Sequence, residues 1–372
     1  MHIGVATGFS HMRGDAVPYS TFIRDQIENL VWAEELGFDS VWINEHHFTD
    51  YSITPDPLMY LSYIAGRTKN LRLATQVLVL PWHNPVRVAE QLLILDHASS
   101  GRVIAGFGRG LARREFDGLR SEHAKSNDIF DDTLRLVVKA IETGVIGGKG
   151  KVIDQPEREL FPKPFRSFEG RMFTTGSTPS SVALTAELGL GRMMLDLPHL
   201  RNDPNKPTPP DVYGDTWRKV HGEAKAPPPP FMSGMFLVDE SSERAHEIGR
   251  KYAAKFFEAS VAHYEMDADH FAKVPGYESY EKMKIHSPEE FEKSREAYAG
   301  MAVCGTPKEV LERMQSIVST AKPQGFFPQL MFGPMPQDEI TRNMQLFAKA
   351  CVPEIKSWES RSTIDDEFRK AA

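Results

Sequence analysis

Short apolar runs that resemble buried strands alternate with amphipathic helical segments along most of the chain, and this alternation restricts the possible folds more than any other feature. The strand-like runs are rich in β-branched and aromatic residues. We predict eight of them, at residues 3–6, 40–44, 71–80, 102–107, 172–175, 192–197, 231–238 and 326–332. Eight strand–helix units within 372 residues favour a closed (β/α)8 TIM barrel of the α/β class over an open doubly wound sheet.

Helix boundary signals support this pattern. Amphipathic segments are predicted at 22–36, 128–142 and 338–350, and Gly37 provides a C-terminal stop for the first of them. At several predicted helix starts, a capping side chain precedes proline at the first helical position. These starts are Asp56-Pro57, Asn84-Pro85, Thr178-Pro179 and the capping-box sequence Thr306-Pro307-Lys308-Glu309.

Two segments interrupt the alternation. Residues 198–230 contain nine of the 26 prolines and are predicted to be a long loop after the sixth strand, because a linker between domains would not fall between two barrel strands. Residues 260–300 are rich in Tyr, Lys and Glu and form a second predicted insertion, after the seventh strand, either a mobile lid or a solvated loop. We therefore expect a single barrel domain over 1–358, followed by a charged, exposed tail at 359–372.

Composition limits the partners. Hydrophobic residues make up 41% and charged residues 26%, as in folded globular enzymes. The net charge of −7 argues against nucleic acid or an anionic membrane as the main partner. Cys304 and Cys351 are too few for a disulfide framework and have no metal-binding spacing. With no signal peptide or membrane-spanning run, we expect a reduced, cytoplasmic setting.

The segment Glu45-His46-His47-Phe48-Thr49 places an acid and two imidazoles directly after the second predicted strand. Such groups are costly to bury, and binding and catalytic residues concentrate on the loops that a rigid scaffold presents. Adjacent residues of an extended backbone point to opposite sides, and no third ligand is suitably spaced, so we expect no metal. We predict instead that His46 and His47 are catalytic acid/base or hydrogen-bonding groups, with a purely structural pair as the alternative.

A glycine-rich segment, Gly106-Phe107-Gly108-Arg109-Gly110-Leu111, follows the fourth strand. It lacks the spacing of the dinucleotide-binding fingerprint. Its glycines permit close approach of a ligand or of another backbone. Two interpretations stay open: a turn with a surface arginine, or Arg109 directed inward to a phosphate.

The segment Gly176-Ser177-Thr178-Pro179-Ser180-Ser181 follows the fifth strand and opens a helix. Its hydroxyl groups, free backbone N–H groups and helix dipole together suit a phosphate monoester. Ordinary N-capping by Thr178 is the simpler alternative, although it requires only one hydroxyl. Arg109 and this helix start, on neighbouring barrel strands, predict a phosphorylated cofactor across the C-terminal mouth of the barrel.

Several blocks in the first 120 residues resemble the luciferase-like flavin-dependent monooxygenases, and within that family the α chain of bacterial luciferase. The resemblance runs from Met1 to about Lys356 and is weak over 198–300. The blocks are Glu45-His46-His47-Phe48-Thr49, Val79-Leu80-Pro81, Asn84-Pro85-Val86-Arg87-Val88-Ala89-Glu90, Leu95-Asp96, Ser100-Gly101-Arg102 and Gly108-Arg109-Gly110-Leu111.

This resemblance implies a TIM barrel that binds reduced FMN, forms a C4a-peroxyflavin with O2 and oxygenates a small organic substrate such as an aldehyde or a ketone. His46 resembles the family's histidine beside the flavin, and Gln76-Val77 aligns where the family often has a non-proline cis peptide. The cofactor-binding residues that it implies are Glu45, Gln76, Val77, Arg109, Leu111, Gly176, Ser177, Thr178 and Ser181.

The chain departs from the α-chain pattern at Gly108, which replaces a reactive cysteine, and at Ala6, which replaces an aromatic residue. Because of these departures, the resemblance does not by itself imply light emission or a long-chain aldehyde substrate. An F420-dependent oxidoreductase and a non-catalytic flavin-binding or partner subunit are the alternatives. Because no dinucleotide fingerprint is present, we expect a separate NAD(P)H:flavin reductase to supply FMNH2. By analogy with the family we expect a homodimer, or a heterodimer with a related chain.

Overall fold

The computed structural model describes residues 1–12, 16–176, 178–195, 209–271, 274, 277, 280 and 284–364. Its centre is a barrel of parallel strands in the order β13-β10-β9-β8-β5-β3-β2-β1, closed by pairing of β13 with β1. The predicted (β/α)8 barrel is therefore confirmed. The strands are β1 (His2–Thr7), β2 (Ser40–Ile43), β3 (Arg72–Thr75), β5 (Val103–Gly108), β8 (Met172–Thr174), β9 (Gly191–Leu195), β10 (Phe231–Ser233) and β13 (Gly325–Phe326), with β4 (Leu78–Val79) beside β5 and β14 (Gln329–Met331) beside β1.

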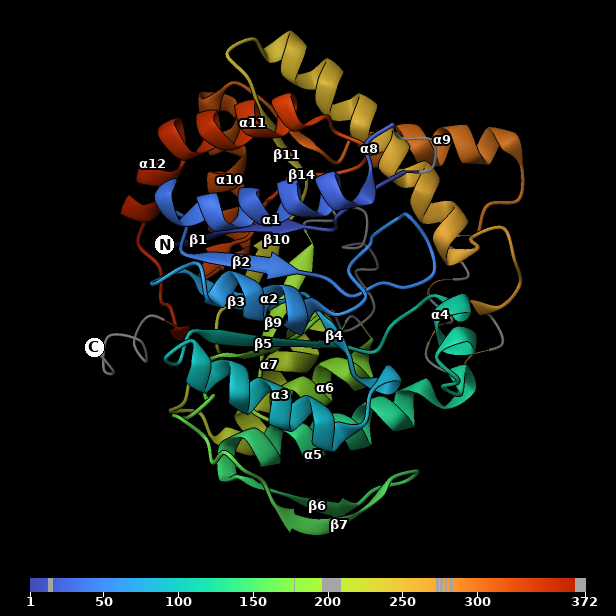
Figure 1. Cartoon of the computed structure of the whole chain (residues 1–372), viewed down its shortest axis with the longest axis vertical. Helices are drawn as coiled ribbons and strands as arrows, with labels where there is room; N and C mark the ends of the chain where they lie inside the picture. The colour runs from blue at the N-terminus through green and yellow to red at the C-terminus, as the bar shows by residue number, and fades with distance from the viewer. Residues whose placement is uncertain are drawn as a thin grey trace.

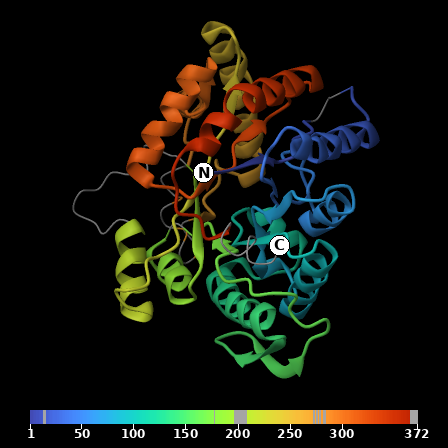
Figure 2. The ribbon, with the colours of Figure 1, turned by 90° about the vertical axis from the view of Figure 1, so that its left-hand side faces the viewer.

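Helices surround the strands, as Figure 2 shows in a view from the side of the N-terminus. Among the described residues we find no helix with the length and hydropathy of a transmembrane segment. The helices are α1 (Tyr19–Glu35), α2 (Pro57–Ala65), α3 (Pro85–Ala98), α4 (Arg113–Gly118), α5 (Ser126–Thr143), α6 (Pro179–Glu187), α7 (Pro209–His221), α8 (Ser242–Tyr264), α9 (Pro288–Ala299), α10 (Pro307–Ala321), α11 (Gln337–Ala350) and α12 (Val352–Ser357), with short 3-10 turns η1 (Leu80–Trp82) and η2 (His123–Lys125).

The predicted helix starts are confirmed by their capping hydrogen bonds. The Asp56 carboxylate accepts from the backbone N–H of Met59 at 3.0 Å, and the Asn84 side chain accepts from that of Val86 at 2.9 Å. Thr306 and Glu309 form the predicted capping box at the start of α10. These caps satisfy N–H groups that a helix cannot pair internally, so the local sequence sets where the helices begin.

One apolar side chain from or just after each barrel strand fills the interior. Alternate strand residues point outward and pack under the helices, as Val5, Val41 and Leu73 do. Because the interior is filled, a reactant has room only beyond the strand ends. The interior cluster consists of Ala6, Trp42, Ala74, Ile104, Phe173, Met193, Phe231 and Phe327, joined by Ile364 from the C-terminal segment.

The C-terminal segment returns to the barrel. Ile364 is fully buried, and the hydroxyl of Thr363 donates to the carbonyl of Gly170 at 3.0 Å. Residues 359–361 are exposed, and the chain turns back to the barrel only at Thr363 and Ile364. The domain boundary at Trp358 stays a prediction, and residues 365–372 lie outside the described residues.

Three of the predicted strands are interrupted. The run 71–80 divides into β3, β4 and η1 around a cis peptide bond between Gln76 and Val77. The run 326–332 is shared between β13 and β14. The prediction of one strand over 231–238 was wrong. β10 belongs to the barrel, whereas β11 (Phe236–Val238) pairs with β12 (Val303–Gly305) in a separate sheet. Apolar composition marks buried backbone but not the point at which it leaves a sheet.

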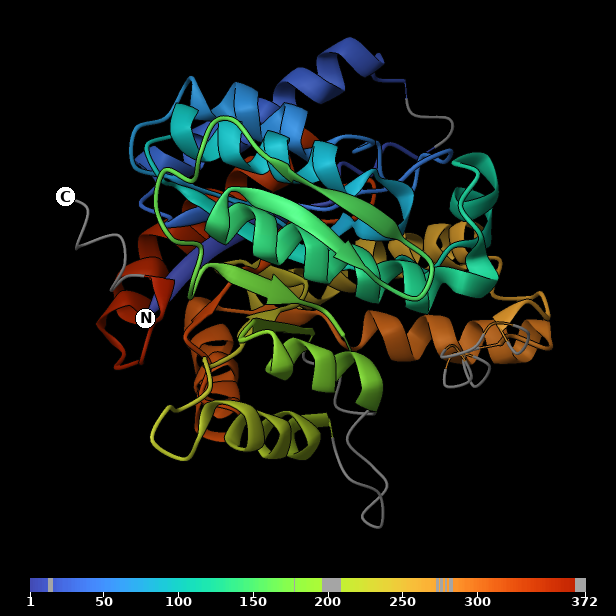
Figure 3. The same cartoon turned by 90° about the horizontal axis from the view of Figure 1, so that it is seen from below.

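Outside the barrel the chain adds a β-hairpin and further helices. The hairpin, β6 (Val145–Lys149) with β7 (Asp154–Glu159), was not predicted, and it lies along α5 (Figure 3). Its second strand, β7, is polar and mostly exposed and carries no apolar pattern that sequence reasoning could detect. Within the predicted insertions, 198–230 contains α7, whereas residues 196–208 lie outside the described part of the chain; 260–300 contains the end of α8 and α9.

Candidate functional site

The C-terminal ends of the parallel strands form one mouth of the barrel. Figure 1 shows α4 and the C-terminal end of α8 at this same end. Arg113 of α4 pairs with Glu265 directly after α8 at 2.7 Å, which holds the two elements together. Most of the site residues predicted from the sequence follow β2, β5 or β8, and these strands end here.

His46 is held by a buried carboxylate that the sequence did not predict. Its Nδ1 lies 3.2 Å from Oε1 of Glu115, a residue of α4 that is fully buried. The backbone N–H of His47 donates to the same oxygen at 2.7 Å. Burial disfavours a charged Glu115, but the neighbouring His46 and His263 outweigh it and lower the pKa of Glu115 to about 2. The carboxylate therefore stays ionised and orients the imidazole of His46.

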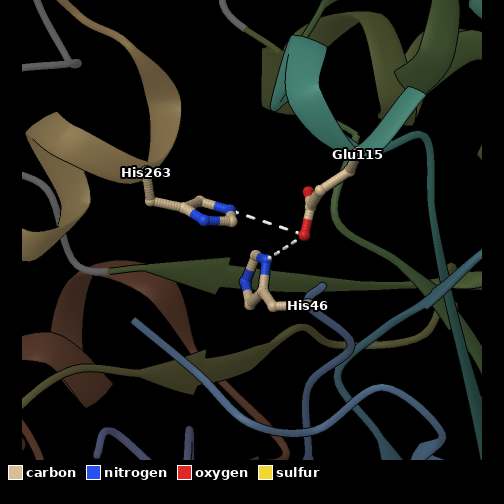
Figure 4. A group of neighbouring side chains, drawn as sticks. All are labelled: His46, Glu115 and His263. Carbon is tan, nitrogen blue, oxygen red and sulfur yellow. Dashed lines mark hydrogen bonds and ion pairs between the residues drawn. The ribbon is translucent and has the colours of Figure 1, made fainter. Parts of the chain in front are cut away.

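A third side chain, His263, reaches the same carboxylate from the last turn of α8. Its Nε2 lies 3.5 Å from Oε1 of Glu115, and its Nδ1 lies 2.6 Å from the hydroxyl of Thr49. The ring stacks on that of Tyr51 with centroids 4.8 Å apart. Figure 4 shows His46, Glu115 and His263 converging from separate parts of the chain, with the second nitrogen of His46 directed away from Glu115.

His47 points the other way, as expected for adjacent residues on an extended backbone. Its Nε2 lies 3.2 Å from Oε1 of Glu45, which also contacts Nε2 of His83 at 2.6 Å. The other oxygen of Glu45 accepts from the backbone N–H of Val79 in β4 at 2.8 Å. Burial raises the pKa of Glu45, but its contacts with His47 and His83 lower the pKa by more, so the net shift is downward. Glu45 therefore fastens the loop after β2 to β4, and the catalytic assignment of His47 stays a prediction.

The cis peptide bond at Gln76-Val77 confirms the expected conformation at this position. The backbone N–H of Gln76 donates to the carbonyl of Ile43 at 2.7 Å, which ties this bend to β2. On the neighbouring strand, a Cβ at Gly108 would lie 2.3 Å from Cγ2 of Val77. Glycine at 108 therefore lets the side chain of Val77 pack directly on the backbone of β5.

Arg109 is partly buried and contacts the second insertion. Its guanidinium lies over the ring of Tyr277, 3.8 Å from the centroid, and it donates to the side chain of Asn127. Tyr277 in turn donates from its hydroxyl to the carbonyl of Gly110 at 2.7 Å. Leu111 packs against the same apolar cluster as Tyr277. The interpretation of Arg109 as a simple surface residue is thus weakened.

The predicted phosphate-binding helix start is α6. Thr178 caps it, with its hydroxyl 3.4 Å from the backbone N–H of Ser181 and 2.8 Å from the Ser181 hydroxyl. A Cβ at Gly176 would lie 2.7 Å from that hydroxyl, so the chain passes close by. Ser177 lies outside the described residues. Since β5 pairs directly with β8, the segments carrying Arg109 and Gly176 leave neighbouring strands, as predicted.

Sequence reasoning missed Glu115 and His263. Glu115 belongs to α4, a helix of six residues that is too short to produce a periodic pattern. His263 lies in the region where the family resemblance is weakest, and nothing in its neighbourhood forms a motif. Glu115 and His263 are brought to His46 by the fold, so their spacing along the chain could not have linked them.

Comparison with known proteins gives a consistent result. The model of the luciferase-like monooxygenase family matches residues 1–321. Among curated proteins, the alkanal monooxygenase α chain of a Kryptophanaron alfredi symbiont is 26% identical over 227 residues, which is 61% of this chain. The match spans 62% of the length of that α chain.

Solved structures share the barrel. A monooxygenase from Streptomyces bottropensis superposes with a TM-score of 0.78 at 23% identity, covering 95% of this chain and 99% of the other. The oxygenating component of 3,6-diketocamphane monooxygenase from Pseudomonas putida, solved with FMN, gives 0.68 at 18% identity, covering 95% and 99%. An F420-dependent secondary alcohol dehydrogenase gives 0.69 at 16%, covering 95% and 98%. At these identities the superpositions establish the fold.

Proposed function

Because the chain belongs to the luciferase-like monooxygenase family, we propose that it is an FMNH2-using monooxygenase that inserts one oxygen atom into a small organic substrate. An aldehyde or a ketone is the proposed substrate class. The observation that carries this proposal is His46, held at the mouth of the barrel by the ionised, buried Glu115. An oriented imidazole with one nitrogen left for a reactant is suited to proton transfer.

The residues at the ends of β5 and β8 fit the phosphate of FMN. The N-terminus of α6 offers backbone N–H groups, the positive end of the helix dipole and the hydroxyls of Thr178 and Ser181. Arg109 follows the neighbouring strand and supplies a cation. A Cβ at Gly106 would collide with the carbonyl of Thr75, and one at Gly108 with the side chain of Val77, so these glycines let β5 pack closely against its neighbours just before Arg109. These groups together would hold a flat phosphorylated cofactor.

When bound there, reduced FMN supplies two electrons and two protons, so that one atom of O2 enters the substrate and the other leaves as water. His46 would hold or deliver a proton beside the reacting atoms through the nitrogen that faces away from Glu115. The partners of His47 and Glu45 are protein groups, from which we infer that both residues position the loop after β2.

Electrons would reach this site from outside the chain. The sequence has no glycine fingerprint for NAD(P)H, and its best glycine cluster, Gly106 to Gly110, forms the end of β5 and the turn that carries Arg109. We therefore propose that a separate NAD(P)H:flavin reductase delivers FMNH2. Pairing of the barrel with a second copy or a related chain is part of the same proposal.

The principal alternative is hydride transfer with the deazaflavin F420, since an F420-dependent dehydrogenase shares the fold. The two activities differ in their need for oxygen. A hydride-transfer enzyme works anaerobically and places no atom of O2 in its product, whereas a monooxygenase requires O2.

The test supplies the purified protein with FMN, NADH, a flavin reductase and a panel of aldehydes and ketones under ¹⁸O2. We expect one ¹⁸O atom in the product of at least one substrate, and loss of that label with His46→Asn but not with His97→Asn, a substitution on the outer helix α3. Oxidation of the panel with F420 in the absence of O2, without label incorporation under ¹⁸O2, would replace this proposal with the alternative.

A further inference from the structure

Three metal-ligating side chains meet at one point of the mouth. His46, Glu115 and His263 each offer one ligand atom, and these three atoms lie within 4.8 Å of one another (Figure 4). They come from the loop after β2, from α4 and from the last turn of α8. The sequence appeared to lack a third ligand because these positions are far apart along the chain.

The spacing of these atoms suits tetrahedral coordination. Zinc binds imidazole nitrogen and carboxylate oxygen at about 2.0–2.2 Å, so neighbouring ligand atoms of a tetrahedral site are about 3.4 Å apart. The observed separations from Oε1 of Glu115 are 3.2 Å to His46 and 3.5 Å to His263. The ligand nitrogens of His46 and His263 lie within 4.8 Å of each other and would move closer together to take an ion among the three atoms.

Two buried atoms of this cluster make no hydrogen bond. Oε2 of Glu115 and Nε2 of His263 are inaccessible to solvent and have no hydrogen-bond partner, and each residue is at least nine-tenths buried. Buried polar atoms are normally paired, so a buried imidazole nitrogen whose nearest polar neighbour is Oε1 of Glu115 at 3.5 Å calls for a closer partner. A divalent cation beside Oε1 would bind this nitrogen and compensate the negative charge of Glu115.

The surrounding contacts resemble those that orient metal ligands. Nδ1 of His263 lies 2.6 Å from the hydroxyl of Thr49, and the backbone N–H of His47 supports Glu115 at 2.7 Å. When Thr49 accepts from Nδ1–H, the lone pair of Nε2 faces the Glu115 carboxylate, an unfavourable arrangement that a cation between them relieves. The side chain of His46 is 15% exposed, which leaves a route for an ion from solvent.

We propose that His46, Glu115 and His263 form a binding site for a divalent transition-metal ion of the zinc class. Two imidazoles and one carboxylate favour Zn²⁺, Co²⁺ or Ni²⁺ over Mg²⁺ or Ca²⁺, which prefer all-oxygen sites. The consequence for catalysis rests on the proposed function: a bound ion occupies Nδ1 of His46 and displaces its hydrogen bond with Glu115. The site would then make the enzyme sensitive to inhibition by zinc.

The test measures binding alone, on the chelator-treated, flavin-free protein. Titration with ZnCl2 by calorimetry, and with CoCl2 by visible absorption, is expected to show one equivalent bound with a tetrahedral cobalt spectrum. His263→Gln and Glu115→Gln should each weaken binding by about a hundredfold or more, and Thr49→Val by about tenfold, as outer contacts of metal ligands do. His97→Gln, outside the cluster, should bind like the wild type.

Thermal melting of each variant checks folding, and Thr49→Val keeps the test informative if a buried ligand variant does not fold. Absence of zinc binding, or equal binding by wild type, His263→Gln and Thr49→Val, would overturn the proposal and leave a proton-sharing network only. Since neither flavin, oxygen nor substrate is present, a negative result here leaves the proposed monooxygenase activity intact. Conversely, absence of ¹⁸O from the products leaves the metal result intact.

Discussion

The two ends of the barrel both bury charged side chains, but they satisfy them differently. At the N-terminal end, Arg171 forms a two-pronged pair with Asp96 at 2.7 and 3.1 Å and also donates to backbone carbonyls, among them Val103. At the C-terminal end, Oε2 of Glu115 and Nε2 of His263 are buried and make no hydrogen bond. Complete pairing indicates a structural role, whereas incomplete pairing indicates groups kept available for a ligand or reactant.

The largest expected effect is at the mouth. We expect His46→Ala to lower product formation by about 10²–10⁴-fold, the usual contribution of a positioned acid/base group. Binding of FMN should change little, because the groups proposed to hold its phosphate follow β5 and β8 instead. Steady-state turnover and flavin titration measure the two quantities separately, with His97→Ala as the control. Wild-type turnover would return His46 to a structural role.

At the N-terminal end of the barrel, called the floor below, the expected effect is on stability. Arg171→Met leaves the carboxylate of Asp96 buried without its partner, which should cost about 3–5 kcal/mol of unfolding free energy. Arg135→Met removes an exposed pair with Glu187 and should cost about 1 kcal/mol or less. Denaturant unfolding of the two variants makes the comparison, and similar small losses in both would remove the distinction between floor and surface.

An effect of intermediate size is expected from substituting Arg109 in the proposed phosphate site. A cation paired with a dianionic phosphate in a partly dry pocket contributes about 2–3 kcal/mol, so Arg109→Ala should weaken FMN binding by about ten- to hundredfold. Turnover at saturating FMN should fall less. Arg87→Ala, on the exposed side of α3, is the control. Unchanged affinity in Arg109→Ala would show that its contacts with Tyr277 and Asn127 are structural.

A smaller effect concerns pH. Burial first, and then the positive charge of His270, lower the pKa of His123 from 6.5 to about 4. Because the folded state prefers the neutral ring, this contribution to stability is complete above about pH 6.5 and is lost as the pH falls toward 4. His123→Gln should flatten the stability profile in that window, as measured by denaturant unfolding at several pH values. An unchanged slope would mean that other groups dominate.

How much the sequence could predict depends on distance along the chain. Caps such as Asn84 and Thr306 are local, so helix starts were predicted correctly, and alternation of strands and helices was enough to predict the barrel. The cis bond at Gln76-Val77 came from family resemblance. The division of 231–238 between two sheets depends on pairing with β12, and the approach of His263 to Glu115 depends on α8 crossing the mouth. Neither leaves a local signal.

The most direct test of the division between the two ends is a matched pair of buried carboxylates, Glu115→Gln at the mouth and Asp96→Asn at the floor. Unfolding free energy and turnover are measured for each. We expect Glu115→Gln to lose up to about 3 kcal/mol of stability, because the ionised carboxylate is buried against its histidine partners, while turnover of the folded fraction falls by about 10² or more. We expect Asp96→Asn to lose about 3 kcal/mol or more of stability while the folded fraction keeps near-normal turnover. Equal losses of stability with unchanged turnover in both variants would contradict the account.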